Sequence, residues 1–209
     1  CVNCQQLLAL TDSCCPGCAL PLPAAAFGLQ CGRCQTRTTR IHTTVAACRY
    51  EAGVSGLITG FKYHRQLAGG RALTALLLDA IRDRYSQTSL PDLLLPVPLH
   101  PARLRQRGYN QALLMARDLS KGLGIPCEAD ALQRVRATPP QQGLSAKERR
   151  RNLRGAFALN PKWDGSHYRR IALIDDVVTT MSTVSEIARV LQRDGDTARE
   201  IHVWCLARA

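Results

Sequence analysis

The sequence has little acidic charge and few aromatic residues. Its 209 residues include 28 lysines and arginines against 16 aspartates and glutamates, so the net charge is +12, and only 5% of the residues are aromatic. This balance favours polyanionic or phosphorylated partners, although a solvated surface without a ligand would have the same composition. The few, scattered aromatic residues do not form an evident stacking platform for single strands.

Long apolar runs and common nucleotide motifs are also missing. The longest apolar candidate, Leu73 to Ile81, is interrupted by Thr74 and Asp79 and falls short of the ~18–20 residues of a membrane span. The chain has no Walker A sequence and no G-x-G-x-x-G, which argues against NTP hydrolysis and against a dinucleotide cofactor. No stretch resembles a signal peptide, so we expect a cytoplasmic protein.

Cysteines are abundant, and seven of the ten lie in the first 34 residues. The pairs Cys15-x2-Cys18 and Cys31-x2-Cys34 are separated by twelve residues. Each C-x2-C turn brings two thiolates to one metal, so the four cysteines predict one structural zinc site. Disulfides are the alternative, which a reducing compartment would disfavour.

A further pair, Cys1-x2-Cys4, has no matching pair in the sequence. We therefore treat Cys1 and Cys4 as candidate ligands of a second metal ion. Because the sequence begins with Cys1 instead of Met, we expect the natural chain to extend upstream, where a partner pair would lie.

Apolar periodicity predicts strands that alternate with helices, and hence a parallel sheet. The predicted strands are 45–50, 93–97, 171–174 and 201–206, and the predicted helices are 54–64, 70–85 and 109–123. In the last helix we expect Ala112, Leu113, Ala116 and Leu119 to face inward. The polar, basic run 134–154 predicts a mobile loop followed by a short helix. We therefore expect a cysteine-rich module at 1–40 and an α/β domain at 41–209.

The most informative segment joins the strand at Ile171–Ile174 to a helix that starts near Val184. Two carboxylates, Asp175 and Asp176, end the strand. Four hydroxyl residues follow in the loop before the helix, namely Thr179, Thr180, Ser182 and Thr183. Backbone N–H groups and the helix dipole favour an anion at such a position, and the acids could bind a sugar diol or a hydrated Mg²⁺.

A purely structural interpretation of this segment is a capping box. Thr183 would then cap the helix and Glu186 would reach back to the Thr183 backbone N–H. A cap needs one hydroxyl and no pair of carboxylates, however, so the whole pattern favours a phosphate site.

Asp175-Asp-Val-Val-Thr-Thr-Met-Ser-Thr183 resembles the PRPP-binding motif of type I phosphoribosyltransferases. The resemblance implies that the acids engage the ribose hydroxyls and that residues 179–183 wrap the 5′-phosphate. Met181 stands where that family usually has glycine, a residue that readily takes a positive φ. Thr179 stands where purine-salvage members often have an acid proposed as the general base. The segment therefore supports binding better than turnover, and enzymatic activity is left open.

Three further segments resemble the ComF/GntX subfamily. They are Pro96 to Gln111 with its R-G-Y-N-Q end, Arg136 to Phe157, and Phe61-Lys-Tyr63. The resemblance covers essentially the whole chain. It implies a type I phosphoribosyltransferase-like parallel sheet flanked by helices, with an N-terminal zinc module. It also implies a role in DNA uptake during competence or in the use of DNA as a nutrient.

In phosphoribosyltransferases a loop after the second strand holds pyrophosphate, and here it would span Leu99 to Arg107. Arg103 and Arg107 would supply the cations, and Mg²⁺ would accompany PRPP. The 134–154 segment would close over the site as a hood. We expect a catalytic role for Asp175, Asp176 and Arg107 if transfer occurs. Solvated helices or contacts to a DNA backbone are the alternative interpretation of these arginines.

Three hypotheses follow. The first is a PRPP-binding, phosphoribosyltransferase-type protein that works in DNA uptake or use. The second is an adaptor without transfer chemistry that binds single-stranded DNA or DNA-processing proteins. The third is a regulator that senses PRPP.

Overall fold

The computed structural model describes residues 8, 13–26, 28–36, 39–138, 146–192 and 199–209. Its main feature is a four-stranded parallel sheet in the order β1-β6-β5-β2, and β3 and β4 form a separate antiparallel pair. The strands are β1 Ile41–Arg49, β2 Leu93–Pro96, β3 Leu132–Arg134, β4 Phe157–Leu159, β5 Arg170–Val178 and β6 Glu200–Arg208. The helices are η1 Ala24–Ala26, α2 Gly32–Thr36, α3 Ala52–Tyr63, α4 Leu67–Arg84, α5 Pro101–Arg107, α6 Gln111–Leu123, α7 Ala146–Leu153 and α8 Ser182–Leu191.

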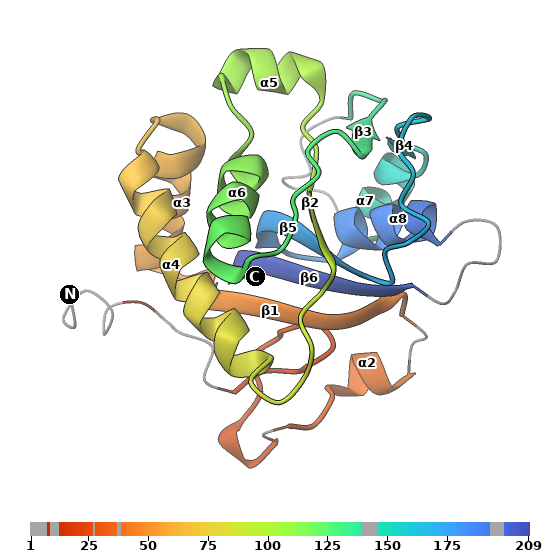
Figure 1. The fold of residues 1–209 in the computed structure, drawn as a ribbon. Helices are drawn as coiled ribbons and strands as arrows, with labels where there is room; N and C mark the ends of the chain where they lie inside the picture. The colour runs from red at the N-terminus through yellow and green to blue at the C-terminus, as the bar shows by residue number, and fades with distance from the viewer. Residues whose placement is uncertain (1–7, 9–12, 27, 37–38, 139–145, 193–198) are drawn as a thin grey trace.

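The sheet is buried on both faces, which explains its nearly continuous apolar strands. Along β5, Ile171 and Leu173 pack on one face, while Ala172 and Ile174 pack on the other. Helices α3, α4 and α6 cover the second face, and α8 covers the first. The cysteine-rich segment with α2 lies beside β1 (Figure 1). The expected α/β architecture with a parallel sheet flanked by helices and an N-terminal cysteine cluster is therefore confirmed.

Several predicted boundaries were wrong. Strands β1 and β5 are longer than expected because both pair with β6 along its length. Residues 101–107, predicted as part of a loop, form helix α5, which begins with Pro101 and is capped by the His100 side chain. In α6, Ala112, Ala116 and Leu119 are buried as expected, and Met115 is buried with them, whereas Leu113 is only half-buried. Among the described helices, none is long and apolar enough to cross a membrane.

The basic run 134–154 also differs from its predicted form. Arg134 ends strand β3, and the Val135 N–H donates to the Ala156 carbonyl, so this part of the expected loop is ordered by pairing. The expected short helix is present as α7. Residues 139–145, in the middle of the expected mobile loop, lie outside the described residues.

Close packing of α3 on α4 gives a first prediction. A Cβ at Gly70 would lie 2.6 Å from ring atoms of Phe61. Gly70→Ala should therefore lower the free energy of unfolding by about 1–3 kcal/mol, measured by urea denaturation. Gly56→Ala is the control, because a Cβ there meets nothing within 4 Å and should stabilise α3 by up to about 1 kcal/mol. Equal effects of the two changes would contradict this packing.

Candidate functional site

Residues 178–183, which run from the end of β5 into the first turn of α8 and are called here the 178–183 loop, form the core of the candidate site. Met181 has a φ of 64°, the left-handed conformation, and α8 begins at the next residue. The loop residues line a small pocket of about 50 Å³ together with Asp175. Thr180 and Ser182 share a hydrogen bond of 2.8 Å between their hydroxyls. Met181 thus takes the backbone conformation for which glycine is usually selected. The loop therefore has this shape although no glycine is present at position 181.

The capping box, the alternative structural interpretation of this segment, does not form. No side chain caps α8, and the residue at the cap position is Met181. The Glu186 carboxylate instead accepts a hydrogen bond of 2.7 Å from the Gly155 N–H and pairs with Arg189. Glu186 therefore connects α8 to the end of α7, and this leaves the start of α8 open towards the pocket.

The two acids point in different directions, because neighbouring residues of a strand face opposite sides of the sheet. Asp175 lines the loop pocket. Asp176 is buried and forms an ion pair with Lys62 of α3, with 2.9 Å between Nζ and Oδ1. The structure therefore brings only Asp175 to the 178–183 pocket. Lys62 is not among the predicted site residues, and the Phe61-Lys-Tyr63 motif is the signal in the sequence that points to it.

The charged groups at this site shift one another's pKa. Burial and the neighbouring Asp176 raise the pKa of Asp175 to about 7, although Lys62 and Arg134 oppose that shift. Burial disfavours the charged form of Lys62, but the ion pair with Asp176 outweighs burial and raises the Lys62 pKa. A carboxyl that titrates near neutrality beside a pocket is typical of a functional site.

Two motifs that are far apart in the sequence bind each other next to Lys62. The Tyr109 hydroxyl donates to the Phe61 carbonyl, and the Gln111 side chain donates to the Lys62 carbonyl over 3.4 Å. Arg107 donates to the Tyr63 hydroxyl over 3.3 Å and to the Gln111 side chain over 3.2 Å. The R-G-Y-N-Q and F-K-Y motifs therefore form one contact that positions Lys62 against β5.

The remaining residues of R-G-Y-N-Q shape the turn between α5 and α6. Gly108 ends α5 with a φ of 83°, and Asn110 caps α6 by accepting from the Ala112 N–H. The Asn110 amide also donates to the Val97 carbonyl over 3.1 Å, which ties the turn to the end of β2. Each position of the motif thus has a structural reason.

The predicted pyrophosphate segment and the hood lie next to each other. Arg103 of α5 reaches the Thr138 carbonyl over 3.5 Å, and Arg134 of β3 contacts the Thr138 hydroxyl over 2.5 Å. Arg134 lies over the Phe157 ring, and its Nε is buried without a hydrogen-bond partner among the described atoms. Burial and Arg103 lower the Arg134 pKa, whereas Asp175 opposes that shift. Leu99 is half-buried just before α5.

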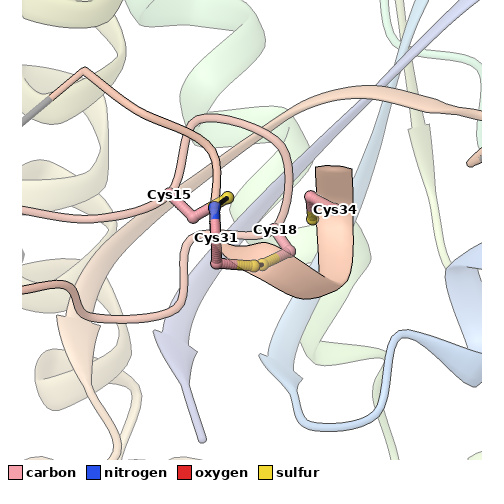
Figure 2. Close-up of side chains that lie close together, drawn as sticks. All are labelled: Cys15, Cys18, Cys31 and Cys34. Carbon is pink, nitrogen blue, oxygen red and sulfur yellow. Dashed lines mark hydrogen bonds between the residues drawn. The ribbon is translucent and has the colours of Figure 1, made fainter. Parts of the chain in front are cut away.

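Four cysteines form a second candidate site (Figure 2). The sulfurs of Cys15, Cys18, Cys31 and Cys34 all lie within 4.8 Å of one another. Cys18 Sγ and Cys31 Sγ are 3.7 Å apart, and the Cys31 N–H donates to Cys15 Sγ over 3.2 Å. Two sulfurs bound about 2.3 Å from one zinc ion in tetrahedral geometry are roughly 3.8 Å apart. The cluster, called here the cysteine knuckle, could therefore hold zinc.

The other cysteines do not join the knuckle. All eight cysteines among the described residues are free thiols, so no disulfide forms there. Cys48 and Cys205 are buried in the core. Cys1 and Cys4, the candidates for a second metal site, lie outside the described residues.

Fold and site together define an α/β protein with a helix-start loop suited to an anion and a knuckle suited to one metal ion. The chain is 43% identical to Competence protein F of Haemophilus influenzae over 88% of this chain and 80% of that protein. It is 39% identical to the DNA utilization protein YhgH of Salmonella typhimurium over 100% of this chain and 89% of that protein. The chain therefore belongs to the ComF/GntX family, to which its motifs pointed.

The other comparisons do not contribute to the family assignment. No protein-family model matches the chain. Among solved structures, adenine phosphoribosyltransferase of Leishmania tarentolae is 13% identical, with a TM-score of 0.36, over 70% of this chain and 74% of that one. At this TM-score the family assignment depends on the two sequence relatives.

The raised pKa of Asp175 predicts a pH-dependent stability. A carboxyl whose pKa is higher in the folded state than its ordinary value of about 4 lowers stability as pH rises from about 4 to 7. Asp175→Asn removes this cost. The free energy of unfolding of the variant, measured relative to that of the parent protein, should therefore be roughly 1–3 kcal/mol higher at pH 8 than at pH 5. Urea denaturation at the two pH values measures this difference. A variant whose relative stability is the same at both would refute the raised pKa.

The knuckle predicts one tightly bound zinc ion. Cys31→Ser should lose about one zinc per chain, because it removes one of four thiolate ligands. It should also lower the melting temperature, since bound metal stabilises the folded state. Zinc content after dialysis and thermal denaturation measure these effects. Cys127→Ser is the control, because Cys127 lies outside the cluster, and equal zinc in both variants would exclude the site.

Proposed function

We propose that this protein binds PRPP, or a closely related phosphoribosyl ligand, at the 178–183 loop, and that it works in DNA uptake or in the use of DNA as a nutrient. The role in DNA uptake or use is inferred from the names of its relatives, Competence protein F and DNA utilization protein YhgH. The ligand is inferred from the loop.

The conformation of Met181 is the observation that carries the proposal. Its φ of 64° gives the loop the backbone that a T-T-G-x-T sequence would adopt. The N–H groups at the start of α8, with the hydroxyls of Thr180, Ser182 and Thr183, suit a 5′-phosphate in the adjoining pocket. Asp175 at the same pocket suits a ribose hydroxyl.

Cations beside the pocket suit the pyrophosphate group. The unpartnered Nε of Arg134 would donate a hydrogen bond to a ligand oxygen. Arg103 lies near Arg134, because both side chains contact Thr138. Arg107 lies near Lys62. When a ligand binds, Lys62 and Asp176 would give up their ion pair and contact the ligand or Mg²⁺ instead. We propose binding only, because Thr179 supplies no carboxylate as a general base.

A second candidate function is that of a DNA-binding adaptor. The observation that favours it is the excess of positive charge, +12 overall, with Arg105 of α5 exposed beside Arg103 and Arg107. An exposed arginine on a helix of a strongly basic protein suits the phosphates of single-stranded DNA.

Calorimetric titration of the zinc-loaded protein with PRPP and Mg²⁺ tests the first proposal. We expect saturable binding, and at least about tenfold weaker binding in the Asp175→Asn, Asp176→Asn double variant. Asp79→Asn is the control for loss of a carboxylate, because Asp79 is exposed on α4, and it should bind like the parent protein. Absence of PRPP binding by the parent protein would sink the proposal.

Two loop variants sharpen the titration. Met181→Gly should retain binding, since glycine takes a positive φ freely, whereas Met181→Val should weaken it because a β-branched residue resists that conformation. The adaptor function predicts a different pattern. Single-stranded DNA would bind with a steep salt dependence that the double variant leaves unchanged and that Arg105→Ala reduces.

A further inference from the structure

One buried arginine connects the cysteine knuckle to the 178–183 loop. Arg208, at the end of β6, is only 2% exposed. Its Nε donates to the Cys18 carbonyl over 2.7 Å, and its Nη1 donates to the Val178 carbonyl over 3.0 Å and to the Thr179 carbonyl. Nη1 also contacts the Ala209 oxygen. A single guanidinium thus contacts the knuckle with one nitrogen and the loop with another.

On the knuckle side, Arg208 completes a set of three anchors. The Thr44 N–H donates to the Pro16 carbonyl over 3.0 Å, and the Thr44 hydroxyl donates to the Gly17 carbonyl over 2.8 Å. With Arg208 on Cys18, three consecutive carbonyls of the Cys15–Cys18 turn are fixed to β1 and β6. The turn that presents two thiolates is therefore held by the same strands that carry the main sheet.

On the loop side, Arg208 fixes the peptide groups that lead into the pocket. The Val178 carbonyl also accepts from the Ala209 N–H over 3.0 Å. Because a peptide unit is planar, fixing the Thr179 carbonyl also sets the direction of the Thr180 N–H. These peptides immediately precede Met181, whose left-handed conformation depends on a well-held surrounding backbone.

We propose that Arg208 is a positioning residue that couples metal binding at the knuckle to the shape of the 178–183 loop. With zinc bound, the Cys15–Cys18 turn is rigid and Arg208 is held between two fixed groups of carbonyls. Without zinc, the turn loosens, Arg208 loses its anchor, and the loop samples other conformations. Zinc therefore tightens the proposed phosphate site from a distance, and this last step rests on the proposed function.

The chemistry of the two partners supports this coupling. Four thiolates around one Zn²⁺ carry a net negative charge, which attracts a nearby guanidinium. Arginine is required because its planar fork donates in several directions at once, whereas a lysine ammonium on a flexible stem cannot hold both sides in one geometry. Arg208→Lys keeps the charge and removes the bridge.

Hydrogen exchange measured by mass spectrometry on the full chain tests the coupling without any phosphate ligand. In the parent protein, removing zinc with a chelator should speed exchange of the 178–183 amides by about tenfold. In Arg208→Lys, zinc should still bind, but its effect on the loop should fall below about twofold. Exchange in α6 reports global stability, so the zinc effect on the loop is the change in the 178–183 amides beyond any change in α6.

Two further variants keep the test decisive. Thr44→Val removes an anchor on Gly17 but keeps the bridge, so zinc should still protect the loop as in the parent protein. Cys31→Ser removes a metal ligand while Arg208 stays intact, so its loop should exchange as in the chelated parent protein. The coupling is overturned by a parent loop that ignores zinc, by a zinc effect of equal size in Arg208→Lys, or by a Cys31→Ser loop that remains protected.

Titration with PRPP and Mg²⁺ separates this inference from the proposed function. Chelation should weaken binding by about tenfold in the parent protein and by less than about twofold in Arg208→Lys. If PRPP binds neither form, the proposed function fails, and the exchange data alone decide the coupling. If PRPP binds equally with and without zinc, and the loop exchange ignores zinc, only the coupling fails.

Discussion

The parallel pairing of β5 with β6 is the constraint on which the site depends. It extends β5 beyond the end of β2, so that Asp175 lies inside a paired strand opposite Cys205. The same register places Val178 beside Arg208. A shift by one residue would turn Asp175 to the other face of the sheet and would separate Arg208 from the carbonyls that it holds. The two candidate sites are therefore positioned by one ladder of hydrogen bonds.

The second face of the sheet is organised by the contact between the F-K-Y and R-G-Y-N-Q motifs. Arg107, predicted to bind pyrophosphate, is held there by Tyr63 and Gln111, and the same contact presents Lys62 to Asp176. Burying an ion pair costs desolvation energy, which good geometry and additional hydrogen bonds must offset. The hydrogen bonds from Tyr109 and Gln111 to the Phe61 and Lys62 carbonyls fix the backbone at Lys62 and so help to supply that geometry.

The parts of the fold and site that could be predicted are those set by residues close together in the sequence. Apolar runs located the strands, and the spacing of Cys15, Cys18, Cys31 and Cys34 located the knuckle. The loop at 178–183 was found because its residues are consecutive. Long-range partners were missed, because nothing near Lys62 or Arg208 in the sequence indicates Asp176 or Cys18. The bond between Glu186 and Gly155 could not be predicted for the same reason, since the two residues are 31 positions apart. Helix α5 was missed although His100-Pro101 carries a usual helix-start signal.

The anchoring of the Cys15–Cys18 turn on Thr44 has a consequence for solubility. β1 is an outer strand of the sheet, and its Thr44 N–H is occupied by the Pro16 carbonyl. At the opposite edge, Leu94 of β2 is covered in the same way by residues 126–128. Exposed strand edges recruit strands from other molecules. The Cys15–Cys18 turn thus covers part of the β1 edge, and loss of this contact would expose an edge on which aggregation can begin.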